Sequence, residues 1–450
     1  MNSCSSVDKS RSTIRVVTLG CSKNLVDTEH LLAQVKDRFE IIPEDDDRPV
    51  DYFLVNTCGF IGDAKEESIQ AILEAAELKK AGKVGQLLVF GCLSQRYNAE
   101  LPDMIPEVDG WYGARDLSPV VRALGCRMKP RLANERLRKD AALPYAYLKI
   151  SEGCDRRCSY CAIPFIRGPH KSVPMEDILA EARSLADSGV KELILIAQDT
   201  TYYGLDIYHR RALAELLEKL SEIEGIRRIR IHYSYPADFP EDVLDQMASN
   251  PKVCRYLDIP LQHVSDKVLD MMHRHVDGRW TRELIRKMRE KVPGIVLRTT
   301  MIVGHPGEGE EEFNELLDFV KVAHFERLGA FTYSEEEGTY DAEHFPDSVP
   351  EEVKKERLDI LMNEQSHISS GFNESRIGTE VVVLADYVND GIIVCRSEYE
   401  SPEVDGEILV KFEPETMGES ADNLVGRFFK VRITEADEYD LVGDFVTFVD

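Results

Sequence analysis

The sequence predicts an α/β protein with three parts: an N-terminal parallel α/β sheet domain, a central partial (β/α)6 barrel and a small C-terminal antiparallel β-barrel. Short apolar runs alternate with helical patterns from Ile14 to about Cys126, and six more strand-like runs separated by helical patterns follow, up to Ser334. Closely spaced strands with Asn-Asp-Gly and Val-Asp-Gly turns end the chain. A length of 450 residues, at roughly 150 residues per domain, suits about three domains.

The first part, placed at residues 13–128, reads strand, helix, strand, helix, strand. The expected strands are IRVVTLGC, DYFLVNTC and QLLVFGC, and the expected helices are VDTEHLLAQVKDRF and DAKEESIQAILEAAELKKA. Strands that alternate with helices form a parallel sheet. The polar, basic segment KPRLANERLRK then lies within a predicted linker at residues 129–142, which is expected to be solvated.

The second part, placed at residues 143–371, contains the six strands YAYLKI, VKELILIAQD, RRIRIHYS, RYLDIPLQ, GIVLRTTMIVG and RLGAFTYS. Repeated βα units build a barrel whose working residues follow the carboxyl ends of the strands. Six units instead of eight predict an open, incomplete barrel. A helix around VPEEVKKERLDILMNEQSHIS leads into the third part, at residues 372–450.

Charge and composition limit the possible partners and the compartment. The net charge of −27 disfavours binding to nucleic acid, because that affinity depends mainly on Lys and Arg, and it favours a basic partner. Residues 373–450 carry 6 Lys and Arg against 19 Asp and Glu. No stretch approaches the roughly 18 apolar residues that a membrane span needs, and no signal peptide is recognised, which predicts a cytoplasmic protein. In that reducing compartment the ten cysteines favour metal binding or catalysis over disulfides.

Three of these cysteines follow the first strand of the predicted barrel as C-x3-C-x2-C: Cys154, Cys158 and Cys161. Thiolates are the usual ligands of iron-sulfur clusters, and three of them leave one iron of a four-iron cluster open. That iron can chelate the amino and carboxylate groups of S-adenosylmethionine, whose reductive cleavage yields a 5'-deoxyadenosyl radical. The alternatives are a zinc knuckle, which normally needs four protein ligands, or unrelated core cysteines. Tyr160 either presents its backbone to the adenine or packs.

A second set of cysteines is dispersed in the sequence. Cys21, Cys58 and Cys92 each end one of the three N-terminal strands, in TLGC, NTC and FGC. Because a parallel sheet gathers its carboxyl strand ends along one edge, these thiols could converge on a second cluster. The alternative is that all three are small buried apolar residues, and the spacing alone leaves both open.

Other motifs receive plainer interpretations. His273 and His275 flank Arg274 just past a helix, which predicts a solvated helix cap. The turn Gly304-His305-Pro306-Gly307-Glu308 either approaches a cofactor or is simply a tight turn. The other four cysteines are interpreted as incidental or buried, namely Cys4, Cys126, Cys254 and Cys395.

With these motifs the chain resembles the methylthiotransferase branch of the radical-SAM superfamily over nearly its whole length. GCSKNLVDTE, VNTCGFIGDAKEESI and YLDIPLQHVSDKVLDMMHR resemble its RimO subfamily, which methylthiolates an aspartate of ribosomal protein S12. The resemblance implies a methylthiotransferase domain, a radical-SAM domain and a TRAM domain, in that order. It also implies two [4Fe-4S] clusters, one on Cys154, Cys158 and Cys161 and an auxiliary one on Cys21, Cys58 and Cys92.

The resemblance further implies how the reaction proceeds. One S-adenosylmethionine yields the radical that removes hydrogen from the β-carbon of the aspartate, and a second methylates a sulfur carried on the auxiliary cluster. A one-electron donor such as flavodoxin or ferredoxin is implied. Val173 and His305 depart from the family pattern, which often has Arg and Phe there.

Two other functions stay open at this point. A MiaB-like enzyme would modify an adenosine of tRNA, but the acidic C-terminal part favours a basic protein over a nucleic acid. A non-catalytic cluster protein, such as an electron carrier, would not consume S-adenosylmethionine.

Overall fold

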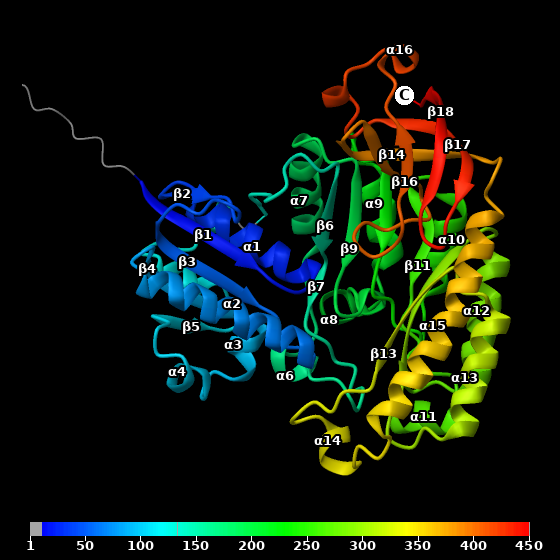
Figure 1. The fold of residues 1–450 in the computed structure, drawn as a ribbon, viewed down its shortest axis with the longest axis horizontal. Coiled ribbons are helices and arrows are strands. Elements are labelled where there is room, and N and C mark those ends of the chain that lie inside the picture. Colours follow the sequence, from blue (N-terminus) through cyan, green and yellow to red (C-terminus); the bar gives the residue numbers. More distant parts are fainter. Residues whose placement is uncertain (1–10, 133, 450) are drawn as a thin grey trace, which may run out of the picture. The chain divides into compact units, whose positions relative to one another are not determined.

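The computed structural model describes residues 11–132 and 134–449, which fall into two compact units (Figure 1). The first unit runs up to Lys139 and also includes Phe165–Gly168. The second unit comprises Asp140–Pro164 and everything from Pro169 onward. Cys4 lies outside the described residues. No helix in the described part of the chain is long and apolar enough to cross a membrane.

The first unit contains a parallel five-stranded sheet in the order β2-β1-β3-β4-β5. Its strands are β1 Ser12–Thr18, β2 Phe39–Ile42, β3 Val50–Thr57, β4 Val84–Gly91 and β5 Gly110–Tyr112. Its helices are α1 Ser22–Val35, α2 Gly62–Lys80, α3 Cys92–Arg96, α4 Leu101–Met104 and α5 Ser118–Ala123, with a 3-10 turn at Pro130–Leu132. The three predicted strands are therefore confirmed, and two short edge strands were missed.

An apolar core packs against each face of this sheet. The core against one face contains side chains of α1 and α5, such as Leu31 and Val121. The core against the other face contains side chains of α2, such as Ile72 and Ala75. Both faces are thus covered by helices, which explains why β3 and β4 read as almost continuous apolar runs.

The basic segment after this sheet packs against α1 instead of being a solvated connection. The Arg136 guanidinium donates to the Glu29 carboxylate, and both side chains are buried. Lys129 Nζ lies 2.7 Å from Asp37 Oδ2. The expectation of a solvated segment was therefore wrong, because its cations have acidic partners on α1 and just after it.

The second unit contains a parallel six-stranded sheet in the order β13-β12-β11-β10-β9-β6. Its strands are β6 Tyr145–Lys149, β9 Glu192–Ile196, β10 Arg228–Ile231, β11 Val253–Asp258, β12 Val296–Val303 and β13 Arg327–Thr332. These are the six predicted strands, and β6 and β13 are the two edges, as expected for an open barrel. A small antiparallel pair, β7 Ser151–Glu152 and β8 Lys171–Ser172, lies beyond β6.

Helices connect and cover these strands. They are α6 Ile163–Arg167, α7 Met175–Asp187, α8 Leu205–Tyr208, α9 Leu213–Ser221, α10 Glu241–Ser249, α11 Asp266–Met271, α12 Gly278–Lys291, α13 Glu310–Ala323, α14 Tyr340–His344 and α15 Glu351–Glu374, with a 3-10 turn at Thr200–Tyr202. One large apolar core joins α7, α9, α10, α12, α13 and α15 to the sheet, and most of α6 belongs to the first unit. The long helix α15 lies along β13 and contributes Leu361 to this core (Figure 1).

The C-terminal strands close into a five-stranded barrel in the order β14-β15-β16-β18-β17. They are β14 Glu380–Asn389, β15 Ile392–Arg396, β16 Ile408–Lys411, β17 Phe428–Ala436 and β18 Leu441–Phe448, with α16 Pro414–Met417 and a 3-10 turn at Ala421–Asn423 between β16 and β17. The predicted small barrel is confirmed with one correction: β16 and β18 pair in parallel, while the other four pairings are antiparallel. Closing the barrel requires this pairing, which joins strands that are not consecutive.

A buried ion network lies at the amino ends of the six strands. Glu192, the first residue of β9, accepts a 2.9 Å hydrogen bond from Arg230 and a 3.1 Å hydrogen bond from Arg396, at the end of β15. Arg228 lies 3.5 Å away. Burial raises the pKa of Glu192, but the three arginines outweigh it and lower the pKa to about 2. The carboxylate therefore stays charged inside the protein.

The loop of residues 397–405, between β15 and β16, continues this network. Arg230 donates to the carbonyl of Glu398 at 2.9 Å, and the Tyr256 hydroxyl donates to Asp405 at 2.7 Å. Glu400 is fully buried and forms ion pairs with Arg327 and Arg376. The loop therefore joins the C-terminal barrel to the amino edge of the six-stranded sheet.

Candidate active site

The three clustered cysteines lie in the loop that follows the first strand of the six-stranded sheet, as predicted. The Cys161 backbone N–H donates to the carbonyl of Cys158 at 3.1 Å. Burial raises the pKa of Cys154 to about 12 and that of Cys161 well above its usual value, and in each case neighbouring thiols add to the rise. The three sulfur atoms are therefore close enough to affect one another electrostatically, and metal binding would have to displace the protons of Cys154 and Cys161.

A buried arginine, which lies between His273 and His275, contacts this loop. Arg274 donates from Nη1 to the Cys158 sulfur at 3.4 Å and to the Tyr160 hydroxyl at 3.3 Å. Its guanidinium also lies 4.3 Å from the centre of the Tyr235 ring. The interpretation as a solvated cap was wrong for Arg274, which is 3% exposed. Nothing in its sequence context distinguishes it from an exposed helix end.

Two further aromatic and charged contacts order the same loop. Arg156 donates to Asp199 at 2.9 Å and lies 4.1 Å from the centre of the Tyr235 ring. The Tyr160 hydroxyl accepts from Arg274, and burial keeps the pKa of Tyr160 well above its usual value. The predicted contact between the Tyr160 backbone and adenine stays a prediction.

His305, which departs from the family pattern, has a buried partner. Its Nε2 lies 2.8 Å from Asp341 Oδ2, and both side chains are fully buried. The backbone N–H of Asp341 donates to the carbonyl of Ser159 in the cysteine loop. In the same turn Glu308 accepts from the Gly304 N–H, which favours the tight-turn interpretation. His305 therefore supports α14, which in turn holds the cysteine loop.

The dispersed cysteines follow three neighbouring strands of the first unit. Cys21 follows β1, Cys58 follows β3 directly, and Cys92 begins α3 directly after β4. A Cβ atom on Gly20 would lie 2.6 Å from that of Cys58, and one on Gly59 would lie 2.7 Å from the Leu93 backbone. Glycines thus allow the three strand ends to pack closely, as the topological argument expected.

Electrostatics distinguish these three thiols. Burial raises the pKa of Cys92 to about 12, although Arg167 opposes the rise, and desolvation raises the pKa of Cys58 as well. Desolvation also acts on Cys21, which is partly at the surface, but the charges of Lys23 and Arg167 outweigh it and lower its pKa. Arg167 Nε donates to the Cys92 sulfur at 3.2 Å.

Within the described ranges, no group of three or more His, Cys, Asp or Glu side chains has the arrangement of a site for a single metal ion. Ligands of a four-iron cluster each bind a different iron and therefore lie farther apart than ligands of one ion. Cys254 and Cys395 are buried, as expected for incidental cysteines, and Cys126 is half-buried.

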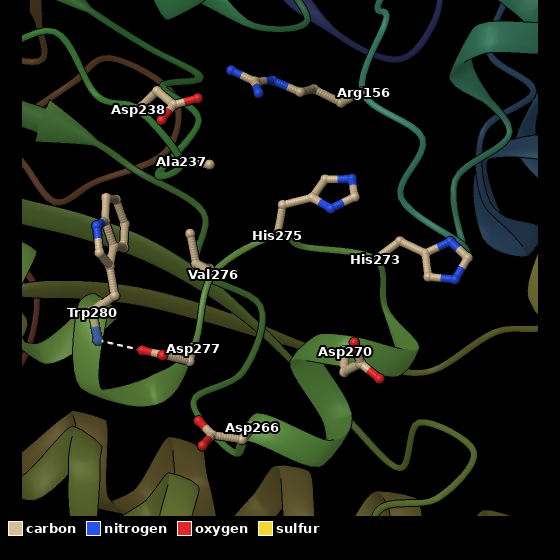
Figure 2. Close-up of a pocket in the computed structure, with 10 residues that line it drawn as sticks. All are labelled: Arg156, Ala237, Asp238, Asp266, Asp270, His273, His275, Val276, Asp277 and Trp280. Carbon is tan, nitrogen blue, oxygen red and sulfur yellow. Dashed lines mark hydrogen bonds between the residues drawn. The ribbon is translucent and has the colours of Figure 1, made fainter.

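A pocket of about 690 Å³ lies beside the cysteine loop in the second unit and includes Arg156 (Figure 2). Its polar lining is mostly acidic, because Asp238, Asp266, Asp270 and Asp277 contribute to it. Figure 2 shows the Asp277 carboxylate accepting a hydrogen bond from the backbone N–H of Trp280, an interaction that caps α12. None of the six cysteines lines the pocket.

Family models match three segments of the chain. Residues 148–320 match the radical SAM superfamily, residues 377–446 match the TRAM domain, and residues 13–113 match a family described as uncharacterized protein family UPF0004. Among solved structures, the radical S-adenosylmethionine methyltransferase TsrM from Kitasatospora setae has a TM-score of 0.54 at 14% identity, covering 92% of this chain and 86% of its own. That likeness concerns the fold alone.

Curated relatives match over nearly the full length. A protein from Bacteroides fragilis named ribosomal protein uS12 methylthiotransferase RimO is 49% identical over 97% of this chain and 100% of its own length. A protein of the same name from Porphyromonas gingivalis is 49% identical over 97% of this chain and 99% of its own. A third, from Cytophaga hutchinsonii, is 46% identical over 97% of this chain.

Proposed function

The chain belongs to the RimO family of ribosomal protein uS12 methylthiotransferases, and we propose that it adds a methylthio group to the β-carbon of an aspartate in that protein. One observation carries the proposal: the first unit has three cysteines that follow the carboxyl ends of three neighbouring parallel strands, and the second unit has three cysteines in the loop after its first strand. One set suits radical generation and the other suits sulfur transfer. Neither set alone would support both halves of the reaction.

The donor set in the second unit fits a four-iron cluster with an open iron. Cys154, Cys158 and Cys161 supply three thiolates, and Arg274 provides positive charge beside one of them. The buried hydroxyls of Ser151 and Ser159 have no hydrogen-bond partner among the described residues, which fits a polar ligand next to this loop. When bound, the cluster would supply the electron that cleaves S-adenosylmethionine to the radical that attacks the target carbon.

In the first unit, Cys21, Cys58 and Cys92 would hold the auxiliary [4Fe-4S] cluster, which brings the proposed number of clusters to two. The close packing at Gly20 and Gly59 supports this assignment, because it brings three strand ends together. These thiols supply the sulfur-transfer half of the proposed chemistry. Arg167 neutralises part of the negative charge that thiolates would gather there.

Charge supports a basic protein as the substrate over the MiaB-type alternative, a tRNA. Residues 373–450 carry 19 acidic side chains against 6 basic ones, and two of those six, Arg376 and Arg396, are buried in ion pairs. The pocket beside the cysteine loop is also acidic. Such surfaces attract a basic ribosomal protein and repel phosphate.

The remaining parts of the proposal concern the setting of the reaction. S-adenosylmethionine serves as the second cofactor, and a one-electron donor such as flavodoxin or ferredoxin supplies the electrons. Both belong to the cytoplasm, where we place the enzyme. The proposed domains are residues 13–128 for the methylthiotransferase domain, 143–371 for the radical-SAM domain and 372–450 for the TRAM domain, with a linker at 129–142.

Anaerobic reconstitution followed by assay with purified substrates tests the proposal. We expect about eight irons per chain, four for each cluster, and formation of 5'-deoxyadenosine on reduction. Mass spectrometry should show one added methylthio group on uS12 and none on tRNA. A gain on tRNA with unmodified uS12 would overturn the substrate assignment, and about four irons per chain would contradict the second cluster.

A further inference from the structure

A single buried amide connects the ends of the strands that carry the dispersed cysteines. Asn24 lies in the first turn of α1, three residues after Cys21, and is fully buried. Its Nδ2 donates to the carbonyl of Leu19, at the end of β1, at 2.7 Å, and to that of Thr57, at the end of β3, at 3.2 Å. The side chain therefore ties the Cys21 loop to the residue that precedes Cys58.

Arg167 connects the third cysteine, Cys92, to Asn24. Its Nη2 donates to Asn24 Oδ1, its Nε donates to the Cys92 sulfur at 3.2 Å, and its Nη1 donates to Asp27 at 2.7 Å. A guanidinium only donates hydrogen bonds, so it must face the amide oxygen of Asn24. That orientation turns the Asn24 NH₂ group toward the two strand-end carbonyls. One arginine thus fixes both a thiol and the amide that joins the other two loops.

A buried ion pair lies within this cluster. The Arg167 side chain is 2% exposed and that of Asp27 is 9% exposed, so the ion pair between them is buried. Burial of such a pair is favourable only when the remaining donors are also satisfied. Nε can be satisfied by the Cys92 sulfur and Nη2 by Asn24. One charged donor, Arg167 Nε, is therefore directed to the Cys92 sulfur.

The place of Arg167 in the chain makes this arrangement unusual. Arg167 follows Cys161 by six residues, yet Phe165–Gly168 belongs to the first unit while Cys161 belongs to the second. It is the only charged residue in the apolar run Ala162–Pro169. A lone charge within an apolar run was the sequence signal for this role.

We propose that Arg167 and Asn24 are positioning residues of the auxiliary site: Asn24 holds the three cysteine loops together, and Arg167 orients Cys92 and raises the reduction potential of the cluster there. The inference rests on the proposed function, because it requires an iron-sulfur cluster on Cys21, Cys58 and Cys92. Hydrogen bonds and positive charge at a ligating sulfur favour the reduced cluster, and such supporting contacts typically change affinity or activity 10- to 100-fold.

The test uses the full chain with Arg167→Gln, reconstituted anaerobically. For potentiometry, Cys154, Cys158 and Cys161 are also replaced by Ala, so that only the auxiliary site can hold iron. We expect the auxiliary midpoint potential, followed by electron paramagnetic resonance, to shift to more negative values, and chelator to remove its iron faster. In the otherwise wild-type chain, 5'-deoxyadenosine formation should stay within about twofold, while methylthio product per deoxyadenosine should fall roughly tenfold.

Arg115 provides a matched control. This exposed arginine donates to the backbone carbonyls of Phe165 and Ile166 and so holds the same segment, but it contacts no cysteine. Arg115→Gln should leave the auxiliary potential unchanged. Arg167→Lys, which keeps the charge but not the three-armed geometry, should recover part of the potential and little of the coupling.

The outcomes separate the inference from the proposed function. An unchanged auxiliary potential in Arg167→Gln, or an equal shift in Arg115→Gln, would overturn the role of Arg167. Asn24→Ala should lose auxiliary iron to chelator faster than wild type, and equal retention would overturn the role of Asn24. A wild-type chain that binds only about four irons would instead contradict the proposed function itself.

Discussion

Two buried carboxylates at the amino edge of the six-stranded sheet have charged partners, whereas several buried polar groups at its carboxyl edge have no partner among the described residues. At the amino edge, Glu192 and Glu400 each meet two or more arginines, and the 397–405 loop covers the strand ends. At the carboxyl edge, the buried hydroxyls of Ser151 and Ser159 and the amide oxygen of Gln198 lack a partner among the described residues. Paired charges suit a permanent structural contact, and unpaired groups suit a ligand.

This difference separates stability from chemistry within one sheet. Substitutions at the amino edge should cost folding free energy, while substitutions at the carboxyl edge should cost reaction or binding. The dispersed cysteines of the first unit provide a third region, where loss should affect only sulfur transfer. Four experiments test this separation, and the variant with the largest expected effect comes first.

The largest effect is expected for Cys158→Ala, which removes the thiol that contacts Arg274. It should abolish 5'-deoxyadenosine formation in a chromatographic assay, because a cluster with two remaining thiolates cannot hold its iron. Cys58→Ala, in the other set, should keep some deoxyadenosine formation but lose methylthio transfer. Equal loss in both variants would mean that the auxiliary site is structural only, or that its removal unfolds the chain.

Glu192→Gln should have the largest effect on stability. It removes the negative charge shared by Arg228, Arg230 and Arg396 and leaves the buried Arg228 and Arg230 without a carboxylate partner, while Arg396 keeps Asp386. Loss of one partner from a buried ion pair costs about 3–5 kcal/mol in the free energy of unfolding, measured with urea. Glu215→Gln, which breaks pairs at the surface, serves as the control and should cost less than about 1 kcal/mol. Similar losses of unfolding free energy in the two variants would contradict the stabilising role of the buried ion network.

Acid should weaken the amino edge selectively. The pKa of Glu192 and that of Glu400 are lowered to about 2 from an ordinary value of 4.5, because buried arginines surround both carboxylates. A lowered pKa in the folded state stabilises the fold above pH 4.5, and this stabilisation is lost as the pH falls toward 2. Each group contributes about 3 kcal/mol on this basis.

Urea unfolding of wild type and Glu192→Gln at several pH values between 7 and 3 measures the contribution of Glu192. The difference between the two free energies of unfolding should shrink as the pH falls below 4.5. A difference that stays constant over this range would contradict the lowered pKa.

The smallest effect is expected at the carboxyl edge for Ser159→Ala. Because the Ser159 hydroxyl has no partner among the described residues, its loss should change the free energy of unfolding by less than about 1 kcal/mol. Affinity for S-adenosylmethionine, measured by anaerobic calorimetry on reconstituted enzyme, should weaken roughly 3- to 10-fold, the value of one hydrogen bond. Ser249→Ala, far along the chain on α10, should not change that affinity.

Some strands and cysteine sites could be predicted from the sequence more readily than others. The six strands and the loop of Cys154, Cys158 and Cys161 could be recognised because their signals are local: apolar runs between helical patterns, and a short cysteine spacing. The dispersed cysteines were recognised through topology, since parallel strands share a carboxyl edge. The short strands β2 and β5, of four and three residues, were missed because so few residues give no periodicity.

Contacts between distant residues were beyond prediction. Arg274 looks like an ordinary surface cation until the fold brings it to Cys158, and the lone charge of Arg167 in an apolar run does not reveal that it contacts Cys92. The parallel pairing of β16 with β18 was missed for a similar reason. Consecutive strands suggest antiparallel hairpins, but closure of the barrel pairs two strands that are not consecutive in the chain. The amino-edge network combines both difficulties, since Glu192 and Arg396 are 204 residues apart.

The 397–405 loop has a consequence for how this chain can change over generations. A C-terminal domain that is connected to the rest of a protein only by a linker can be exchanged between proteins during evolution. Here the C-terminal barrel provides carbonyl and carboxylate partners for Arg228, Arg230 and Arg327. Removal of the barrel would leave these buried cations without those partners. Substitutions on either side of this contact must therefore be compensated on the other, and the two parts are expected to be inherited together.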